Sequence, residues 1–264
     1  MPRFKLLIEY AGTRYSGWQI QKNARTVQGE IDRAVRAATN RREFELYGAG
    51  RTDAGVHALA QVAHLELYTN LAPELLRRKI NDELPADIHI RSITKAPHKF
   101  HARHDAVERS YLYQISTRRT AFGKPFVWWI REPLALDAMR EAAAAFVGMQ
   151  DFEAFTVDDP EEKSTTVRVD AVDIEEHGAL ILIRVRGSHF LWKMVRRMAG
   201  VLAAVGRREI PAGDAAAFLD PSRVSDARAT AAALAAPAAG LFLEAVRYKA
   251  DPPIGSMRPV IAID

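Results

Sequence analysis

The chain has 264 residues, of which 48% are hydrophobic and 27% charged, and its 37 basic and 33 acidic residues give a formal net charge of +4. This composition is typical of a folded protein with one large domain or two of about 130 residues each. The sequence contains no cysteine, which excludes disulfides, thiolate zinc sites and catalytic thiols. It lacks an apolar run of membrane-spanning length and the apolar core of a signal peptide, so we expect a cytoplasmic protein.

The first hundred residues predict the order strand, helix, strand, strand, helix, strand. Apolar residues recur at helical spacing in 26–40 and 72–85, and strands are predicted at 4–12, 44–48, 56–63 and 88–96. Thr26 is placed to cap the first helix, and Pro73 and Pro85 mark the start and end of the second. This is the ferredoxin-like arrangement that many RNA-binding domains use.

The second half predicts the same plan with additions. Strands are expected at 109–117, 126–130, 167–176, 179–187 and 240–248, and helices at 136–148 and 191–206. Residues 177 and 178, His-Gly, are typical of a hairpin turn. We therefore predict an α+β protein of two ferredoxin-like domains, with mainly antiparallel sheets packed side by side around a basic cleft. The expected domains are 1–102 and 103–250, followed by a tail at 251–264.

The stretch GAGRTDAGVHALAQVAH, residues 48–64, begins as a glycine turn and ends as a strand with one firmly apolar face. Its three glycines permit backbone conformations that a Cβ would prevent, so the loop can hold the short side chain of Asp53 in a fixed direction. That placement suits a catalytic carboxylate. The alternative is that Asp53 caps its own turn and that Arg51 is a solvated neighbour.

Basic side chains gather on two predicted helices and one strand, where they could contact phosphates and stack bases. A solvated helix face and ordinary aromatic packing explain the same residues equally well. The residues are Arg77, Arg78 and Lys79; Lys193, Arg196 and Arg197, on the side of their helix away from its apolar positions, with Arg207 and Arg208 beyond its end; and Arg109 beside Tyr111 and Tyr113.

His101 and His104 are three residues apart, but no HExxH motif follows and no compact set of carboxylates surrounds them, so we predict no metal site. Residue chemistry alone thus predicts a two-domain α+β protein with features of RNA binding. It specifies no reaction.

Several ordered blocks resemble those of the tRNA pseudouridine synthase A family. GRTDAGVHA is similar to the family's active-site signature, and the other blocks run from about residue 4 to residue 248. They are YAGTRYSGWQIQ, TVQGEI, FHAR, ERSYLYQI, DFEAF, GSHFLWKMVRRMAG and GLFLEAVRY. The resemblance implies isomerisation of uridine to pseudouridine in the anticodon stem-loop of tRNA, at tRNA positions 38, 39 and 40. It also implies a homodimer that needs no cofactor.

The resemblance assigns roles residue by residue. Asp53 matches the catalytic aspartate, which acts as nucleophile or base, and Tyr111 matches a tyrosine that stacks on the flipped uracil. Arg196 matches an arginine that pairs with this aspartate and keeps it ionised. Arg51 matches an arginine that fills the stack after the base has left it. We expect further substrate contacts from the basic side chains Arg109, Arg77, Arg78, Lys193 and Arg197.

Four positions depart from the family pattern: Ala11, Gln150, Glu153 and His104. None belongs to the matched catalytic set, so these departures bear on RNA contacts and on site selection. Two other functions remain open. A non-catalytic RNA-binding or chaperone protein would need the basic and aromatic surface but not the catalytic set. A carboxylate-dependent N-glycosidase would need Asp53 but not the basic surface.

Overall fold

The computed structural model describes residues 1–159, 162 and 164–263. The chain divides into two compact units, Met1–Val107 with Phe242–Pro253, and Glu108–Leu241 with the segment that starts at Ile254. The predicted domains ended at residues 102 and 250. The contacts instead assign residues 242–253, close to the C-terminus, to the first unit, and the last segment to the second.

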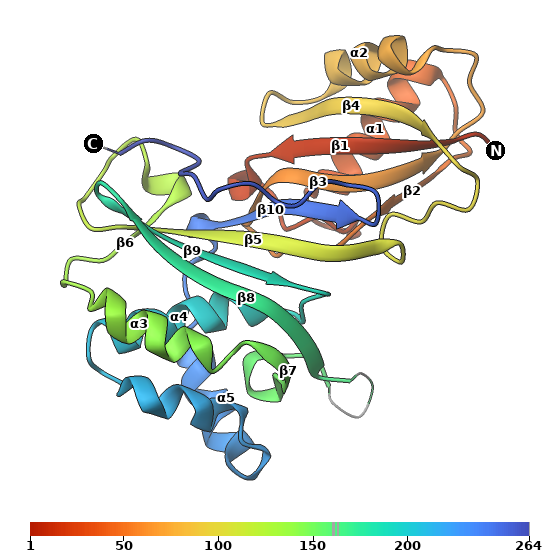
Figure 1. The fold of residues 1–264 in the computed structure, drawn as a ribbon. Helices are drawn as coiled ribbons and strands as arrows, with labels where there is room; N and C mark the ends of the chain where they lie inside the picture. The colour runs from red at the N-terminus through yellow and green to blue at the C-terminus, as the bar shows by residue number, and fades with distance from the viewer. Residues whose placement is uncertain (160–161, 163, 264) are drawn as a thin grey trace. The chain divides into compact units, whose positions relative to one another are not determined.

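The first unit has the predicted order of elements, β1-α1-β2-β3-α2-β4. In its sheet β1 lies between β3 and β4 and is antiparallel to both, while β2 pairs with the C-terminal part of β3. A late strand, β10 (Leu241–Tyr248), runs parallel to the first residues of β3. The bounds are β1 Arg3–Tyr10, α1 Val27–Thr39, β2 Glu45–Gly48, β3 His57–Glu66, α2 Pro73–Glu83 and β4 Ile88–Ala96 (Figure 1).

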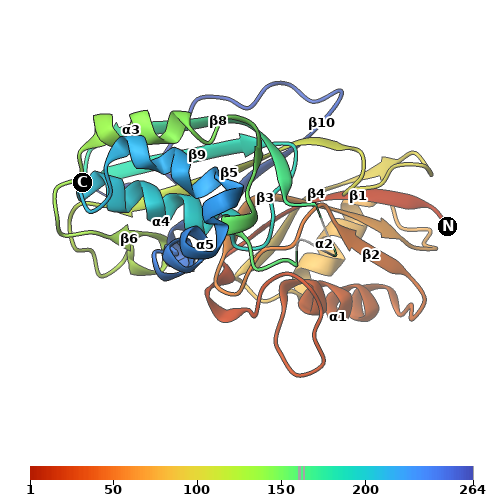
Figure 2. The ribbon, with the colours of Figure 1, turned by 90° about the horizontal axis from the view of Figure 1, so that it is seen from below.

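Local signals explain where these elements begin and which faces they bury. The Thr26 side chain accepts a hydrogen bond from Gly29 N (3.2 Å), which caps α1 as predicted, and Pro73 begins α2. Figure 2 shows α1 and α2 on the same side of the sheet. The residues of β1 and α1 that are buried in the core are Phe4, Leu6, Ile8, Tyr10, Val27, Ile31, Ala34 and Val35.

Strand β3 differs from its prediction, because both of its faces are covered. The expected apolar residues Ala58 and Val62 are buried, but so are the polar side chains of His57, Gln61 and His64. Each polar side chain has a backbone partner, which limits the cost of burying it. His57 and His64 accept hydrogen bonds through Nδ1, and Gln61 donates one through Nε2.

The second unit contains an antiparallel sheet in the order β5-β9-β8-β7, with β6 parallel to the end of β5. Helices α3 and α4 pack together, and α5 packs against α4 and the 3-10 turns η3 and η4 (Figure 1). The bounds are β5 Ala106–Ser116, β6 Trp128–Trp129, α3 Leu136–Ala144, β7 Gly148–Asp151, η3 Glu153–Phe155, β8 Thr166–His177, β9 Leu180–Gly187, α4 Met194–Gly206, η4 Ala212–Leu219 and α5 Val224–Ala233. Short 3-10 turns also occur at η1 Gly12–Arg14, η2 Lys124–Phe126, η5 Pro221–Arg223 and η6 Ala238–Gly240.

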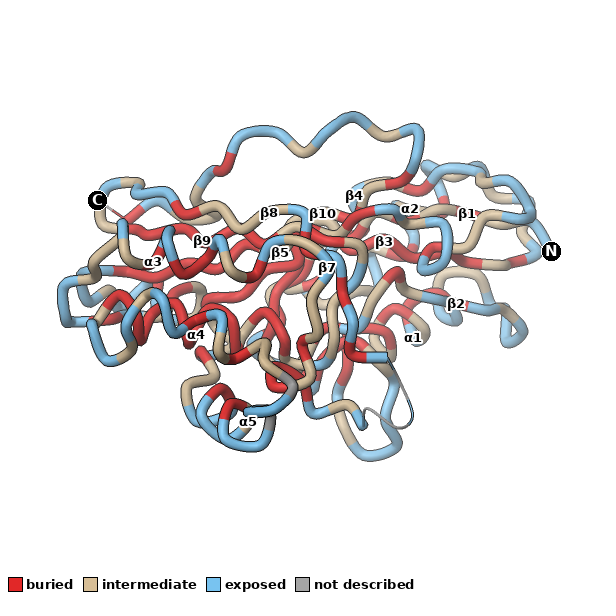
Figure 3. The backbone as a smooth tube through the Cα atoms, turned by 60° about the horizontal axis from the view of Figure 1, so that its bottom comes forward, coloured by how far each residue is buried: buried red, intermediate tan, exposed pale blue. Residues whose placement is uncertain are grey.

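The predicted hairpin around Gly178 is confirmed, since β8 ends at His177, β9 begins at Leu180 and Gly178 has a φ of +59°. Helix α4 is buried along nearly its whole length and circumference (Figure 3). A Cβ on Gly200 would lie 1.9 Å from the carbonyl oxygen of Leu234, so glycine is needed for this close approach. Every helix among the described residues is too short or too polar to cross a membrane.

Candidate active site

The loop between β2 and β3 carries Asp53 at the first position of a tight turn. Val56 N donates a hydrogen bond to the carbonyl oxygen of Asp53 (3.1 Å), and Gly55 has a φ of +80°. This is the pattern of a type II turn, whose third residue needs the positive φ that glycine supplies. The prediction of a glycine-dependent turn is therefore confirmed for Gly55. Gly50 needs no such explanation, because a Cβ there would point into open space.

Burial changes from one residue to the next along the loop that carries Asp53. Arg51 is exposed, Thr52 is buried and Asp53 is half-buried. The Thr52 hydroxyl lies 2.8 Å from the Tyr10 hydroxyl, and both are buried in the first unit. Burial raises the pKa of the Tyr10 phenol, so Tyr10 stays protonated and keeps a hydrogen to donate. The buried Thr52 side chain thus anchors the loop between its two more exposed neighbours.

The segment from residue 10 to residue 19 supports the loop through its backbone. Trp18 N donates to the carbonyl oxygen of Thr52 (3.1 Å), and Gly55 N donates to that of Tyr15 (3.2 Å). In the same segment Gln19 accepts a hydrogen bond from Nε of Arg51 (3.1 Å). Because these bonds are distributed along the loop, they hold Asp53 in place from both sides.

Two glycines of this segment are required for its approach to the loop. A Cβ on Gly12 would lie 1.9 Å from the carbonyl oxygen of Val56, and one on Gly17 would lie 2.5 Å from that of Thr52. Gly12 N also donates to Nδ1 of His57 (3.0 Å). The family resemblance includes this segment as a block but implies no role for it. Its signal is the pair of glycines, whose absent Cβ atoms permit backbone-to-backbone contact.

In the second unit, Tyr111 and Arg109 lie on β5 beside the segment that follows β9. The Tyr111 ring packs edge-on against Phe190, with ring centroids 5.2 Å apart, and the tyrosine is half-buried. Arg109 donates from Nη1 to the carbonyl oxygen of Ser188 (2.7 Å). The Tyr111 ring is thus held in its orientation by an aromatic neighbour.

Arg196 lies in the first turn of α4 and is half-buried. Its Nε donates to the carbonyl oxygen of Ala236 (2.8 Å), and Ala236 N donates to the carbonyl oxygen of Arg196 (3.0 Å). The bond through Nε orients the planar guanidinium. Lys193 precedes the helix with a φ of +64°, and its ammonium lies 5.5 Å from the centre of the Trp192 ring.

Arg197 is buried, although its helical spacing placed it away from the apolar positions of the helix, where it was expected to contact the substrate. The residue is 4% exposed, and its Nη1 donates to the carbonyl oxygens of Ala154 (2.9 Å) and Thr156 (2.7 Å). Burial lowers the pKa of this guanidinium. The helical pattern misplaced it because α4 is packed on several sides, so that the face judged polar is covered by η3. Arg197 therefore holds the η3 segment and is not available to phosphates.

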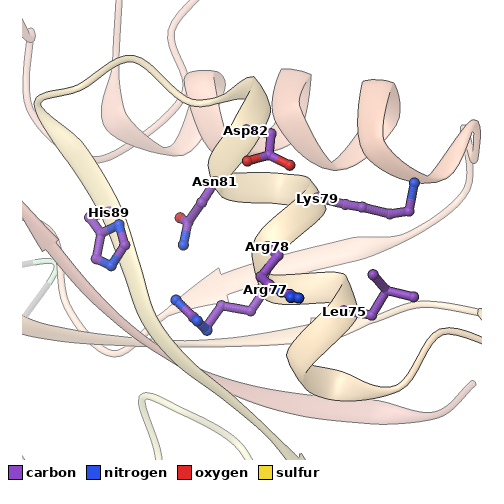
Figure 4. Close-up of a pocket in the computed structure, with 7 residues that line it drawn as sticks. All are labelled: Leu75, Arg77, Arg78, Lys79, Asn81, Asp82 and His89. Carbon is purple, nitrogen blue, oxygen red and sulfur yellow. The ribbon is translucent and has the colours of Figure 1, made fainter.

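The basic residues of α2 border a surface hollow (Figure 4). Arg77 forms two hydrogen bonds with the Glu74 carboxylate (2.6 and 3.0 Å), whereas Arg78 and Lys79 are exposed. Figure 4 shows Arg77 on the side of α2 that faces β4 and Lys79 on the opposite side. The hollow is lined by Leu75, Arg77, Arg78, Lys79, Asn81, Asp82 and His89. Beyond α4, Arg207 forms an ion pair with Glu209 (2.7 Å) and Arg208 is exposed.

His101 and His104 lie close together, with ring centroids 4.2 Å apart. Nδ1 of His101 accepts hydrogen bonds from the backbone N of Arg103 (3.2 Å) and of His104 (3.3 Å). The lone pair of this nitrogen is therefore engaged in hydrogen bonds to the backbone. Within residues 1–159, 162 and 164–263, no group of three or more histidine, cysteine or acidic side chains is placed to hold a metal ion.

The sequence of the chain matches a known protein family over most of its length. The sequence pattern of the family described as tRNA pseudouridine synthase matches residues 6–105 and 142–249. A tRNA pseudouridine synthase A of Rhodopseudomonas palustris (strain BisB18) is 42% identical over 253 residues, which cover 94% of this chain and all of that protein. One from Geobacter sp. (strain M21) is 38% identical, with 94% of this chain and 99% of that protein covered.

A solved structure, titled Crystal Structure of a Cbf5-Nop10-Gar1 Complex, aligns with 75% of this chain and 54% of that chain. Its TM-score is 0.32 and its sequence identity 12%. This likeness adds nothing to the sequence matches.

The matched sequence defines an isomerase class, the pseudouridine synthases. Within that class, the chain belongs to the tRNA pseudouridine synthase family, and most of its length is shared with members that carry the name tRNA pseudouridine synthase A.

Proposed function

We propose that this chain converts uridine to pseudouridine in the anticodon stem-loop of tRNA, at positions 38, 39 and 40, with Asp53 as the reacting carboxylate. In this reaction the N-glycosidic bond breaks, the uracil turns and its C5 bonds to the ribose C1′. Substrate and product are isomers, so nothing is consumed. The observation that carries the proposal is a half-buried carboxylate in the GRTD motif, on a loop held by Tyr10, Tyr15 and Trp18.

The support for Asp53 as the reacting group is the rigidity of its loop. A group that adds to a nucleoside or removes its proton must be held within a fraction of an ångström of the reacting atom. The buried Tyr10–Thr52 pair and the close approach of Gly12 and Gly17 supply that restraint. A turn that merely ended a strand would not need this support from a second segment.

The roles of three other residues are carried over from the family. Tyr111 stacks on the flipped uracil, Arg196 supplies the positive charge that keeps Asp53 ionised, and Arg51 replaces the base that has left the stack. The edge-on contact of Tyr111 with Phe190 and the oriented guanidinium of Arg196 suit these roles. Arg51 is exposed, as insertion into RNA requires.

Further contacts with the tRNA backbone are proposed for Arg109, Arg78 and Lys193. Arg77 contributes less, because Glu74 already neutralises part of its charge. We also propose that the chain acts as a homodimer, as the family resemblance implies. Light scattering at micromolar concentration tests this assembly, and a monomer would contradict it.

The proposed reaction is tested by incubating the purified protein with bulk unmodified tRNA and analysing the nucleosides. Pseudouridine at the expected positions supports the proposal. Release of free uracil would identify an N-glycosidase instead, and tRNA binding without either product would identify an RNA-binding protein. Omitting all nucleotides and adding EDTA should leave the rate unchanged, because no step in the proposal needs a metal or a cofactor.

A further inference from the structure

The segment that runs from the end of β5 through β6 carries a concentration of positive charge that no part of the proposed function uses (Figure 1). Residues 117–131 contain four cations, Arg118, Arg119, Lys124 and Arg131, and no aspartate or glutamate. This segment alone contributes +4, which equals the formal net charge of the whole chain. In the described part of the chain none of the four cations forms an ion pair. Their charge is therefore not neutralised by a direct ion pair.

Two large aromatic side chains stand among these cations. Phe122 is 97% exposed and Trp129 is 42% exposed. The Arg119 guanidinium lies 5.6 Å from the centre of the Trp129 ring. A partner that removes this phenylalanine ring from water would gain binding energy from its burial.

The loop is held in one conformation at its base and at its tip. Thr117 N donates to the carbonyl oxygen of Ala179 (2.9 Å), and Ser116 Oγ donates to that of Arg118 (2.6 Å). Around the tip, Gly123 N donates to the Thr120 hydroxyl (3.0 Å). A Cβ on Gly123 would lie 3.0 Å from the Ile263 side chain, so the turn packs closely on the C-terminal segment. Phe122 is thus presented by an ordered turn.

We propose that residues 117–131 form a second RNA-contacting surface, which we call the basic aromatic loop. Its cations contact backbone phosphates, and Phe122 stacks on an unpaired base of the tRNA. Surfaces that bind single-stranded nucleic acid combine exposed aromatic rings with cations that have no ion-pair partner in the protein. The cations pair with backbone phosphates, and unpaired bases stack on the rings. A two-fold contact with a second copy of the same loop fits less well, because it would bring eight unpaired cations together.

The charge of the basic aromatic loop is tested by the salt dependence of tRNA binding. In the variant Arg119→Gln/Lys124→Gln, the slope of log K against log salt should fall in magnitude by about 1.4 to 1.8, because each phosphate contact contributes about 0.7 to 0.9. The matched control is Arg41→Gln/Arg42→Gln, which removes two exposed cations from the loop after α1 and should leave the slope unchanged. Equal changes in the two variants would overturn the proposal.

The aromatic part is tested with Phe122→Ser, which should weaken binding of an unmodified tRNA transcript about 5- to 150-fold at constant salt without changing the slope. Phe122→Tyr, which keeps the ring, should bind within about twofold of the wild type. Because Phe122 is exposed, both variants should keep the unfolding midpoint of the wild type. In the Phe122→Ser variant, KM for tRNA should rise in proportion to the binding affinity that is lost, while kcat at saturating tRNA stays the same.

This inference rests on the proposed function, and the two can fail separately. If the wild type makes no pseudouridine, the proposed function is wrong. If it makes pseudouridine and the Phe122→Ser variant binds tRNA normally, only the basic aromatic loop is wrongly assigned. Light scattering completes the test, since a Phe122→Ser variant that loses an oligomer but binds tRNA unchanged would identify a protein interface instead.

Discussion

The hydroxyl groups of Tyr10 and Thr52 lie 2.8 Å apart beneath the loop that carries Asp53. This contact joins the end of β1 to the residue just before the matched catalytic aspartate, across 42 positions of sequence. A buried hydroxyl that loses its partner destabilises a fold by about 1 to 3 kcal/mol. The pair therefore connects the stability of the first unit with the placement of Asp53.

Replacing Tyr10 with phenylalanine should lower the free energy of unfolding by about 1 to 2 kcal/mol, because it leaves the Thr52 hydroxyl buried without this partner. We also expect kcat to fall while KM for tRNA stays nearly constant, since Asp53 is less firmly held. Tyr68→Phe is the control, because Tyr68 is 59% exposed. Denaturant unfolding and steady-state kinetics measure both effects. Equal stability losses in the two variants would show that the buried pair has no special role.

Asp53→Asn should reduce the rate of pseudouridine formation below about a thousandth of the wild-type rate and leave tRNA binding within a few-fold. A carboxamide fills the same space but serves neither as nucleophile nor as base. Single-turnover assays and binding titrations measure the two quantities separately. Asp214→Asn, at an exposed position, should behave as the wild type. A purified Asp53→Asn enzyme faster than this limit would exclude the assignment.

Arg196→Lys should reduce turnover strongly and tRNA binding less. Lysine keeps the positive charge but loses the planar group that Nε orients through the carbonyl oxygen of Ala236. The pH profile of kcat is the discriminating measurement, because loss of a well-placed cation should raise the apparent pKa of the reacting carboxylate. An active variant with an unchanged pH profile would show that Arg196 does not ionise Asp53.

Arg197→Met should destabilise the protein by about 2 to 3 kcal/mol and leave the salt dependence of tRNA binding unchanged. Its guanidinium bonds two buried carbonyl oxygens in the segment around η3, and methionine cannot replace these bonds. The contrasting variant is Arg208→Asn at an exposed position with a φ of +62°, which asparagine tolerates. If Arg208 contacts a phosphate, that variant loses about 0.7 to 0.9 of the salt slope without losing stability. If Arg197→Met instead lowered the salt slope and kept the stability of the wild type, Arg197 would lie on the RNA-binding surface.

Burial, together with the nearby His101 and Arg3, lowers the pKa of His64 from 6.5 to about 4. The unfolded chain therefore binds more protons than the folded one between these two values. Burial of the neutral His64 side chain therefore contributes a stability that is complete above about pH 6.5 and is lost as the pH falls towards 4. We expect it to amount to about 2 to 3 kcal/mol. His64→Asn retains an acceptor for Ala102 N and should lose less stability between pH 7 and pH 4, as urea unfolding at both values would show. Equal losses in the variant and the wild type would exclude this role.

Features of the fold that depend on nearby residues could be predicted from the sequence. The first strand, the cap at Thr26, the proline that begins α2 and the turn at Gly178 are all confirmed, because short-range periodicity and backbone preferences determine them. The GRTD motif was recognisable for the same reason, since its glycine turn is local. These local signals determined the element order of the first unit, whereas the family was indicated by the resemblance of several ordered sequence blocks.

Features that depend on distant segments were decided by the tertiary structure. Arg196 and Arg197 are neighbours in one helical pattern, yet one is half-buried and the other is enclosed, because η3 packs over only part of α4. The support of Asp53 by Tyr10, the burial of both faces of β3 and the exposure of Phe122 have the same cause. Each depends on which part of the chain lies opposite, and packing between residues far apart in sequence has no periodic signature in the sequence itself.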